Sequence, residues 1–260
     1  METTLYRRVG VAGVGTVGQL VCQAIDAGVV DADLTAVFDA DEGRLQELLG
    51  KLRRLTRSMT LVGMVGSVDL VVECTNPWSA LHMLKAALDG GKDILLTNPA
   101  ALLGNENMLR IARERGLRIL LPSLQLSGLD GLRAARHGRV DSCLVTVTLP
   151  PADLAGKEVP EEGVVFHGTA AEAIAQFPML ANQLALVTMV GVGPLRTAVR
   201  VLSSSRAQHA VYQVDIAGEC GRLASWSNPV AAKGQPRRSK MVAYAAIGAL
   251  ENIFNTVRSV

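Results

Sequence analysis

Aromatic residues, charged residues and net charge are all scarce in this sequence. Of its 260 residues, 3% are aromatic and 19% are charged, and 26 Lys and Arg against 24 Asp and Glu leave a formal net charge of +2. A nucleic-acid-binding protein needs a concentrated basic face, so this balance argues against a nucleic-acid partner. With 49% hydrophobic residues the chain is also unlike a disordered protein, which combines low hydrophobicity with high net charge.

Cysteine is scarce as well, and long apolar runs are missing. The four cysteines are far apart and form neither a CxxC motif nor a cluster with histidine: Cys22, Cys74, Cys143 and Cys220. A disulfide framework and a zinc site are therefore not expected, and no metal is assigned. No run approaches the roughly 18 apolar residues of a membrane span, and the first residues lack the apolar segment of a secretory signal. We expect a cytoplasmic protein with no membrane partner.

Glycine, by contrast, is abundant, and the first half of the chain has a regular rhythm. The 25 glycines exceed the usual ~7%. Short apolar, strand-like runs alternate with helix-like segments, the strands being expected at residues 9–12, 34–38, 68–72, 93–97 and 117–121. This alternation is typical of βαβ units and of a parallel sheet buried on both faces. We predict an α/β protein whose residues 1–121 form a Rossmann domain with a doubly wound parallel sheet.

The rhythm changes after Pro122. Strand-like segments at 142–149, 198–202, 210–217 and 222–226 are mixed with helix-like segments at 169–176 and 179–190, and the Pro-, Glu- and Gly-rich residues 150–165 suggest a loop. Strands and helices outside a βαβ rhythm favour a second, α+β domain. We expect it to span residues 122–238 and to carry the substrate site and the dimer contacts. Residues 239–260 are expected to form a C-terminal helix that can pack back on the first domain.

A glycine-rich turn follows the first predicted strand and opens the first predicted helix. Gly13 permits the tight turn, Gly15 lets the backbone approach a pyrophosphate, and Gly18 lets the helix pack close to the strand. The N-terminus of the helix favours the phosphate charge. We therefore assign the whole turn to dinucleotide binding: Gly13, Val14, Gly15, Thr16, Val17 and Gly18. A tight turn without a ligand is the alternative.

Asp39 follows the second predicted strand, twenty-one residues after Gly18. A carboxylate at this position accepts hydrogen bonds from the adenosine ribose hydroxyls and repels a 2′-phosphate. NAD is therefore the expected cofactor. Arg44 lies close enough in the sequence to keep NADP as the alternative.

Polar residues also follow two further predicted strands. Cys74 and Thr75 come after one strand, and Asn98 comes after the next. Ligands of open α/β sheets bind outside the carboxyl ends of the strands, so we add these three residues to the cofactor site. Capping of the helix that begins at Pro77, by Thr75 or Asn76, is an alternative role that can coexist with cofactor contact.

Four histidines could supply a group for acid–base chemistry. His82 falls inside a predicted helix, and His137 lies in a basic turn. His167 lies at a predicted loop-to-helix junction, and His209 precedes an apolar strand of the second domain. Residue chemistry alone does not separate His167 from His209, and a surface histidine without a role is the alternative for each.

Several segments, in order and at matching spacing, resemble the L-aspartate dehydrogenases, a two-domain NAD(P)-dependent family. The most specific is Phe166–Ala173 with Phe177–Asn182, which is similar to the family's FxGxAxEA…FPxNxN stretch. The other segments that carry the resemblance are Val68–Cys74, Leu121–Asp130, the histidine before a strand at His209, and Gln235–Ser239, which is similar to the family's NPKTS. The resemblance extends from Arg8 to nearly the C-terminus.

The resemblance implies hydride transfer between a nicotinamide ring and Cα of a small amino acid, with L-aspartate as the leading candidate. The reaction would be an oxidative deamination or the reverse reduction of an imine. The resemblance also implies that His209 is the catalytic acid–base residue, which suits a group that titrates near pH ~6.5. Around the substrate we expect Gln125, Asn182, Arg237 and Ser239. The partners are then a small amino acid or imine and, in a homodimer, a second subunit.

The sequence departs from the family pattern beside the expected substrate site. The family's PSGAIGG has small residues where Leu124 and Gln125 stand here, and an asparagine where Ala207 stands. The lysine of NPKTS is Arg237, whose planar fork favours bidentate carboxylate binding. These departures keep two alternatives open, a family member with a different imine or amino-acid substrate and a non-catalytic NAD-binding sensor.

Overall fold

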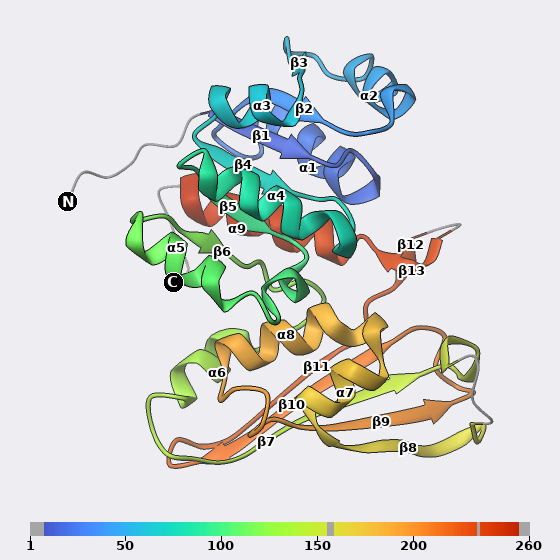
Figure 1. The fold of residues 1–260 in the computed structure, drawn as a ribbon. Coiled ribbons are helices and arrows are strands. Elements are labelled where there is room, and N and C mark those ends of the chain that lie inside the picture. The colour runs from blue at the N-terminus through green and yellow to red at the C-terminus, as the bar shows by residue number, and fades with distance from the viewer. Residues whose placement is uncertain (1–7, 155–158, 233–234, 255–260) are drawn as a thin grey trace. The chain divides into compact units, whose positions relative to one another are not determined.

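The computed structural model describes residues 8–154, 159–232 and 235–254, without the side chains of residues 231–239. Its chain divides into two compact units (Figure 1). The first contains the chain up to Leu124 together with the residues from Val242 onward, and the second contains Gln125–Met241. In the described part of the chain no helix is both long and apolar enough to span a membrane.

The first unit is built on a six-stranded sheet whose pairs are all parallel. The strand order is β3-β2-β1-β4-β5-β6. These strands are β1 (Arg8–Ala12), β2 (Asp33–Phe38), β3 (Arg57–Ser58), β4 (Leu70–Glu73), β5 (Asp93–Leu96) and β6 (Ile119–Leu120). The order reverses between β1 and β4, as in doubly wound sheets, and this confirms the predicted Rossmann fold.

Helices cover both faces of this sheet. They are α1 (Thr16–Asp26), α2 (Glu42–Leu49), α3 (Leu61–Ser67), α4 (Pro77–Asp89), α5 (Glu106–Glu114) and α9 (Met241–Phe254), with a short 3-10 helix η1 (Pro99–Leu102). α1 and α9 share one core cluster with alternate residues of β1, Val9 and Val11. On the other face Met64 of α3 lies against Gly10. Figure 1 shows α1 and α9 on the opposite side of the sheet from α3 and α4.

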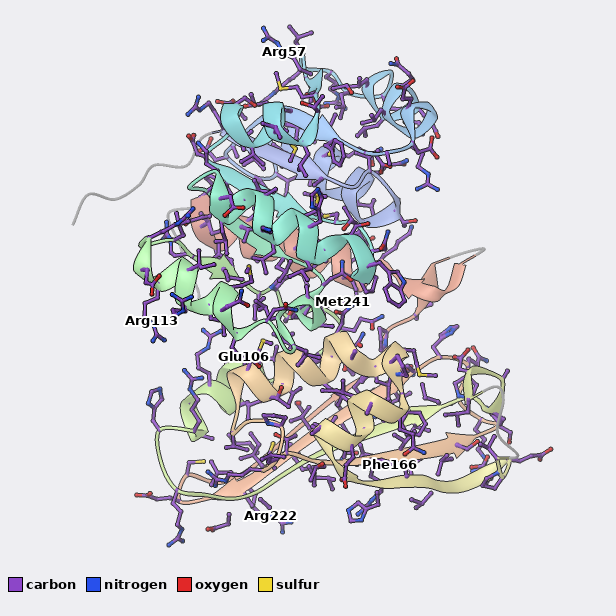
Figure 2. The ribbon with its side chains drawn as sticks, viewed as in Figure 1. Arg57, Glu106, Arg113, Phe166, Arg222 and Met241 are labelled. Carbon is purple, nitrogen blue, oxygen red and sulfur yellow. The ribbon has the colours of Figure 1, made fainter. Side chains whose placement is uncertain are left out.

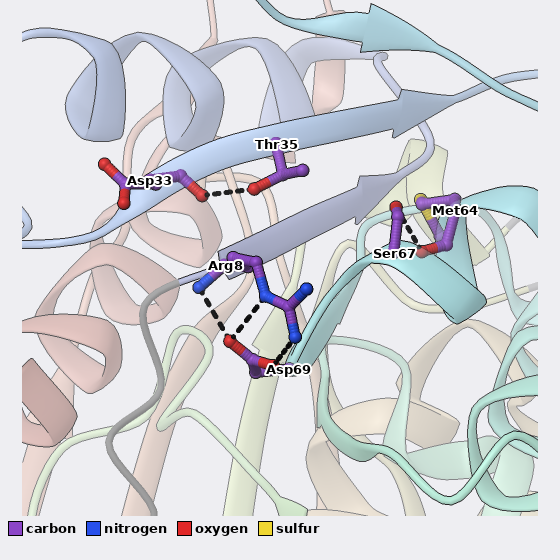
Figure 3. Close-up of polar contacts among 6 residues, drawn as sticks. All are labelled: Arg8, Asp33, Thr35, Met64, Ser67 and Asp69. Carbon is purple, nitrogen blue, oxygen red and sulfur yellow. Dashed lines mark hydrogen bonds and ion pairs between the residues drawn. The ribbon is translucent and has the colours of Figure 1, made fainter.

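The amino ends of β1 and β4 are joined by an ion pair (Figure 3). The Arg8 guanidinium binds the Asp69 carboxylate at 2.6 Å, and the backbone N–H of Arg8 donates to the same carboxylate at 3.1 Å. This pair lies opposite the carboxyl ends of the strands, where the cofactor residues are expected. It therefore joins the two central strands at the edge of the sheet opposite the expected cofactor site.

The second unit contains a five-stranded mixed sheet in the order β11-β10-β7-β9-β8. Its strands are β7 (Val140–Leu149), β8 (Glu162–Thr169), β9 (Ala198–Ser204), β10 (Val211–Gly218) and β11 (Gly221–Ser227). Only β7 and β9 are parallel among its pairs. Burial alternates along β9, as expected for a sheet with one face against helices. The packed helices are α6 (Leu129–Ala135), α7 (Ala170–Gln176) and α8 (Ala181–Val190), which confirms the α+β class.

Three of the sequence-based expectations differ from the structure. The helix expected over 42–56 ends at Leu49 with Gly50 as its C-cap, and β3 and α3 follow it. Residues 162–165 belong to β8 and not to the expected loop. The sequence did not predict this edge strand because it lacks an alternation of apolar and polar residues. The C-terminal helix begins at Met241, since residues 235–239 form β13, which pairs with β12 (Ala231–Ala232).

Candidate cofactor and substrate sites

The glycine-rich turn lies at the carboxyl end of β1. Gly13 has a φ of +89°, in the left-handed region that favours glycine. A Cβ on Gly13 would lie 2.6 Å from the Cys74 carbonyl oxygen, and a Cβ on Gly18 would overlap the Gly13 carbonyl oxygen. The turn therefore packs directly on the end of β4, and neither glycine can carry a side chain without a shift of the backbone.

The N-terminus of α1 is suited to an anion. No side chain caps this helix at Gly15, and its first turn contains no acidic residue. By contrast, Asp41, Thr60 and Asn76 cap α2, α3 and α4 with their side chains. A helix N-terminus with neither a cap nor an acidic residue favours a phosphate. Thr16, Val17 and Gly18 form its first turn, so the chain fits a pyrophosphate at the predicted place.

Asp39 is held beside this turn. Its Oδ2 accepts a hydrogen bond from the Val14 N–H at 2.7 Å, and its Oδ1 accepts one from the Asp41 N–H at 2.9 Å. The side chain of Val14 is fully buried, so Val14 contributes through its backbone. Arg44, the residue that favoured NADP, is ion-paired to Asp41 with 3.1 Å between Nε and Oδ2.

A buried carboxylate that was given no role from the sequence joins the loops after β4 and β5. Glu73 is 0% exposed. Its Oε1 accepts hydrogen bonds from the N–H and the hydroxyl of Thr75, both at 2.7 Å, and from Asn98 Nδ2 at 2.9 Å. Its Oε2 accepts the N–H groups of Thr97 and Asn98, both at 3.1 Å. The available signal was a carboxylate that ends an otherwise apolar strand.

Burial and hydrogen bonding act in opposite directions on this carboxylate. Burial raises the pKa of Glu73, while the hydrogen bonds from Thr75 and Asn98 lower it by a smaller amount. Burial also raises the pKa of the neighbouring Cys74 thiol well above its usual value. Cys74 is therefore a neutral, buried residue whose backbone supports the glycine turn, and its N–H donates to the Ala12 carbonyl at 2.7 Å.

The capping role considered for the loop after β4 belongs to Asn76. Its Oδ1 accepts the N–H groups of Trp78 and Ser79 at 3.0 and 3.1 Å, with Pro77 at the first position of α4. Thr75 instead turns toward Glu73. Thr75 and Asn98, both predicted at the cofactor site, are thus tied to the same carboxylate.

In the second unit, His209 differs from the other histidines. It lies in the loop between β9 and β10, and its Nδ1 is buried without a hydrogen-bond partner among the residues that the structure describes. The other three histidines are exposed: His82, His137 and His167. His167 lies within β8 and not at a loop-to-helix junction. A buried ring nitrogen without a partner is available to a ligand, so burial separates two residues that residue chemistry alone left as equals.

Gln125 forms a side-chain pair with a residue that the sequence analysis did not identify. Its Oε1 accepts a hydrogen bond from Gln183 Nε2 at 2.8 Å. Gln183 follows the predicted substrate residue Asn182 in the first turn of α8, and its own Oε1 is buried with no partner in the described part of the chain. No local pattern signals this contact, because the two glutamines are 58 residues apart.

The residue before Gln125 has an unusual backbone conformation. Leu124 has a φ of +57° and is the only non-glycine residue with a positive φ among those described. Its side chain is 1% exposed. Leucine thus occupies a left-handed position where the family pattern has a small residue, at an expected strain of about 1–2 kcal/mol.

The motif that resembles the family most closely builds the fold of the second unit. Phe166, which is labelled in Figure 2, packs edge-to-face on Phe177 with ring centroids 5.6 Å apart. A Cβ on Gly168 would lie 2.8 Å from the Phe166 ring. Thr169 and Glu172 form a capping box at the start of α7. These residues are therefore explained by packing and capping.

Two predicted substrate residues lie at the margin of the described structure. Arg237 and Ser239 belong to β13, and Ser239 pairs with Ala231 of β12. Their side chains lie outside the described part, so their role stays a prediction. Across the described residues no group of three His, Cys, Asp or Glu side chains could hold a metal ion.

Two protein families match the chain, one after the other. Residues 13–122 match the family described as the NAD binding domain of homoserine dehydrogenase, and residues 130–253 match the C-terminal part of aspartate dehydrogenase. The L-aspartate dehydrogenase of Methanosarcina barkeri is 30% identical over 266 residues, which cover 96% of this chain and 98% of the relative. That of Methanocella arvoryzae is 30% identical over 95% of this chain and 96% of the relative.

Solved structures show the same fold. The aspartate dehydrogenase of Thermotoga maritima has a TM-score of 0.77 at 18% identity, covering 98% of this chain and all of that chain. The scyllo-inositol dehydrogenase of Lactobacillus casei, solved with NAD(H) and scyllo-inositol, has a TM-score of 0.57 at 13% identity and covers 97% of this chain and 90% of that chain.

Proposed function

The chain belongs to the L-aspartate dehydrogenase family, and from that premise we propose that it oxidises L-aspartate with a nicotinamide cofactor. The products are iminosuccinate, the reduced cofactor and a proton, and water then converts the imine to oxaloacetate and ammonia. The observation that carries the proposal is the buried Nδ1 of His209, which has no hydrogen-bond partner among the described residues, in a chain of which nearly the whole length matches L-aspartate dehydrogenases. The reverse reaction, reduction of the imine, uses the same groups.

NAD is the preferred cofactor in this proposal. Asp39 is fixed beside the glycine turn, where its charge repels a 2′-phosphate, and Arg44 is paired with Asp41. Residues 13–18 would hold the pyrophosphate, and Thr75 and Asn98 would line the nicotinamide half. The bound cofactor supplies the acceptor for the hydride that leaves Cα. Proton transfer and substrate binding depend on side chains of the protein.

His209 moves the proton. A neutral imidazole takes a proton from the substrate ammonium, which frees the nitrogen lone pair to form the C=N bond as the hydride leaves. Once the ring has released this proton to solvent, it can take a proton from the water that attacks the imine in the hydrolysis that follows. Such proton transfer typically contributes about 10²- to 10⁴-fold to the rate.

The substrate carboxylates need cationic and hydrogen-bonding partners. The resemblance assigns this role to Gln125, Asn182, Arg237 and Ser239. An arginine at position 237 suits a dicarboxylate, because its planar fork binds a carboxylate through two parallel hydrogen bonds. The partner of Gln125, Gln183, carries a buried oxygen available to a substrate donor.

A cytoplasmic homodimer completes the proposal. Trp226 of β11 is 62% exposed and lies opposite the exposed Gln213 of β10, on the face that the helices leave open, which supports pairing of the second-unit sheets of two subunits. Sedimentation equilibrium at micromolar concentration tests this directly, and a monomer would rule it out.

The activity is tested by incubating the protein with NAD and a panel of amino acids while NADH absorbance is followed. We expect turnover with L-aspartate, a lower rate with NADP, and NADH consumption with oxaloacetate and ammonia. Turnover with another amino acid only would favour a family member with a changed substrate, which the substitutions at Leu124 and Gln125 motivate. NADH binding without any turnover would favour the sensor.

A further inference from the structure

The carboxylate of Glu73 links the loops that follow β4 and β5. It accepts hydrogen bonds from Thr75 in the loop after β4 and from Thr97 and Asn98 in the loop after β5. The next residue, Cys74, supports Gly13 in the turn after β1. These loops end at the carboxyl edge of the sheet, on both sides of the switch point between β1 and β4.

We propose that Glu73 is a positioning residue for the cofactor, which fixes Thr75 and Asn98 in the arrangement that binds the nicotinamide half. The inference rests on the proposed dehydrogenase function. Glu73 is 0% exposed, so it acts through the residues that it holds and not by touching the cofactor. It is therefore distinct from the residues assigned to direct contact.

The hydrogen-bond partners suit an acceptor with two oxygens. Backbone N–H groups of three residues, one amide nitrogen and one hydroxyl converge on the two carboxylate oxygens. None of the ion pairs formed by described residues involves Glu73. Burying a carboxylate without a cation is costly, and these hydrogen bonds offset that cost only while both loops keep their donors in place. Glu73 thus holds the loops after β4 and β5 in fixed positions at the same time.

The same sheet offers a matched control at its opposite edge. Asp93, the first residue of β5, is 8% exposed and accepts the N–H and Nε of Arg118 at 2.7 and 2.8 Å. It is therefore another buried carboxylate that holds backbone, but it lies at the amino end of the strand. Asp93→Asn should destabilise the first unit without moving the cofactor loops.

The test compares Glu73→Gln with Asp93→Asn in the full-length protein. Glutamine keeps one acceptor oxygen but places an NH₂ group next to N–H donors, so the hydrogen bonds to one of the two loops are lost. We expect the Kd for NADH, measured by fluorescence titration, and the KM for NAD to rise by roughly tenfold or more, the loss expected for a charged hydrogen bond. The KM for L-aspartate should stay within about twofold, a split that general destabilisation does not produce. Asp93→Asn should lower the melting temperature and leave the Kd for NADH unchanged.

Glu73→Asp covers the case in which the glutamine variant does not fold. It retains the charge but is shorter by one methylene, so it should weaken NADH binding less than glutamine does. An unchanged Kd for NADH in a folded Glu73 variant, or an equal rise in Asp93→Asn, would overturn the positioning role. The proposed function fails separately, if the wild-type protein neither binds NADH nor oxidises L-aspartate.

Discussion

The two units treat their buried polar groups differently. In the first unit the buried carboxylates Asp26, Glu73 and Asp93 each accept hydrogen bonds from backbone N–H groups. In the second unit lie all three of the buried side-chain polar atoms that lack a partner within the described residues: Gln183 Oε1, Ser203 Oγ and His209 Nδ1. Within the described residues, the first unit thus leaves no buried side-chain polar atom without a partner, whereas the second unit leaves three.

This difference fits the roles predicted for the two units, cofactor binding in the first and substrate binding in the second. A domain whose loops are already ordered binds a cofactor more tightly, because it loses less conformational entropy on binding. A buried polar atom without a partner costs about 1–3 kcal/mol, and a substrate that pairs with it offsets that cost on binding. His209 and Gln183 lie at or beside predicted substrate positions, which is consistent with our proposal that the second unit recognises the substrate.

The largest effect should separate turnover from cofactor binding. We expect His209→Ala to lower kcat by roughly 10²- to 10⁴-fold, because the proton acceptor is lost. The Kd for NADH should stay within about twofold, because the cofactor residues belong to the other unit. Steady-state rates and NADH titration measure the two quantities. His167→Ala, in exposed β8, is the control and should leave both unchanged. Wild-type turnover in His209→Ala would remove the catalytic assignment.

The next effect concerns cofactor choice in the first unit. Asp39→Asn retains the shape of the side chain and removes the charge that repels a 2′-phosphate. We expect the ratio of kcat/KM for NAD to that for NADP to fall by about tenfold or more, as for one charged hydrogen bond. Asp33→Asn, at the exposed other end of β2, should leave the ratio unaltered. An unaltered ratio in Asp39→Asn would argue against its contact with the ribose.

A smaller effect tests the unpaired atoms of the second unit. Gln125→Ala removes the acceptor of Gln183 Nε2, so this nitrogen loses its partner and joins Oε1, which has none within the described residues. The free energy of unfolding should fall by about 1–3 kcal/mol. Adding Gln183→Leu should restore part of the loss, since an apolar pair leaves nothing unsatisfied. Urea denaturation of the single and double variants gives the comparison. A double variant that is less stable than Gln125→Ala alone would contradict it.

The smallest effect has opposite signs at two buried leucines, one in each unit. Leu124, with φ +57°, should lose less stability on change to glycine than on change to alanine, by about 1 kcal/mol. Leu132 in α6 is also 1% exposed, and there glycine should be worse than alanine by about 1 kcal/mol. Thermal denaturation of the four variants measures the difference. The same sign at both positions would contradict the left-handed backbone at Leu124.

Local patterns predicted those parts of the fold whose signal is local. The apolar strands, the glycine turn and the helices after them were predicted because each signal lies within a few residues of sequence. β8 was missed because it is an edge strand with Gly163 at φ +141° and no apolar alternation. β3 and α3 were missed because they are short, with 2 and 7 residues.

The candidate site depends on long-range contacts, and these limited how much of it could be predicted from the sequence. Glu73 stood in a segment already noted, but its partners Thr97 and Asn98 come from another loop, so its role could not be inferred from spacing. The pairing of Gln125 with Gln183 has no local signal either. Residue chemistry left His167 and His209 equal, since the burial of one ring nitrogen depends on tertiary packing, and the family resemblance separated them first.

The transfer of hydride can be followed directly with L-aspartate deuterated at Cα. The protein is incubated with this substrate and NAD, and the mass of the NADH formed is measured. We predict that the NADH carries the deuterium, because the hydride passes from Cα to the nicotinamide ring. NADH without deuterium, or no NADH at all from a protein that binds NAD, would contradict the assignment of this chain as an L-aspartate dehydrogenase.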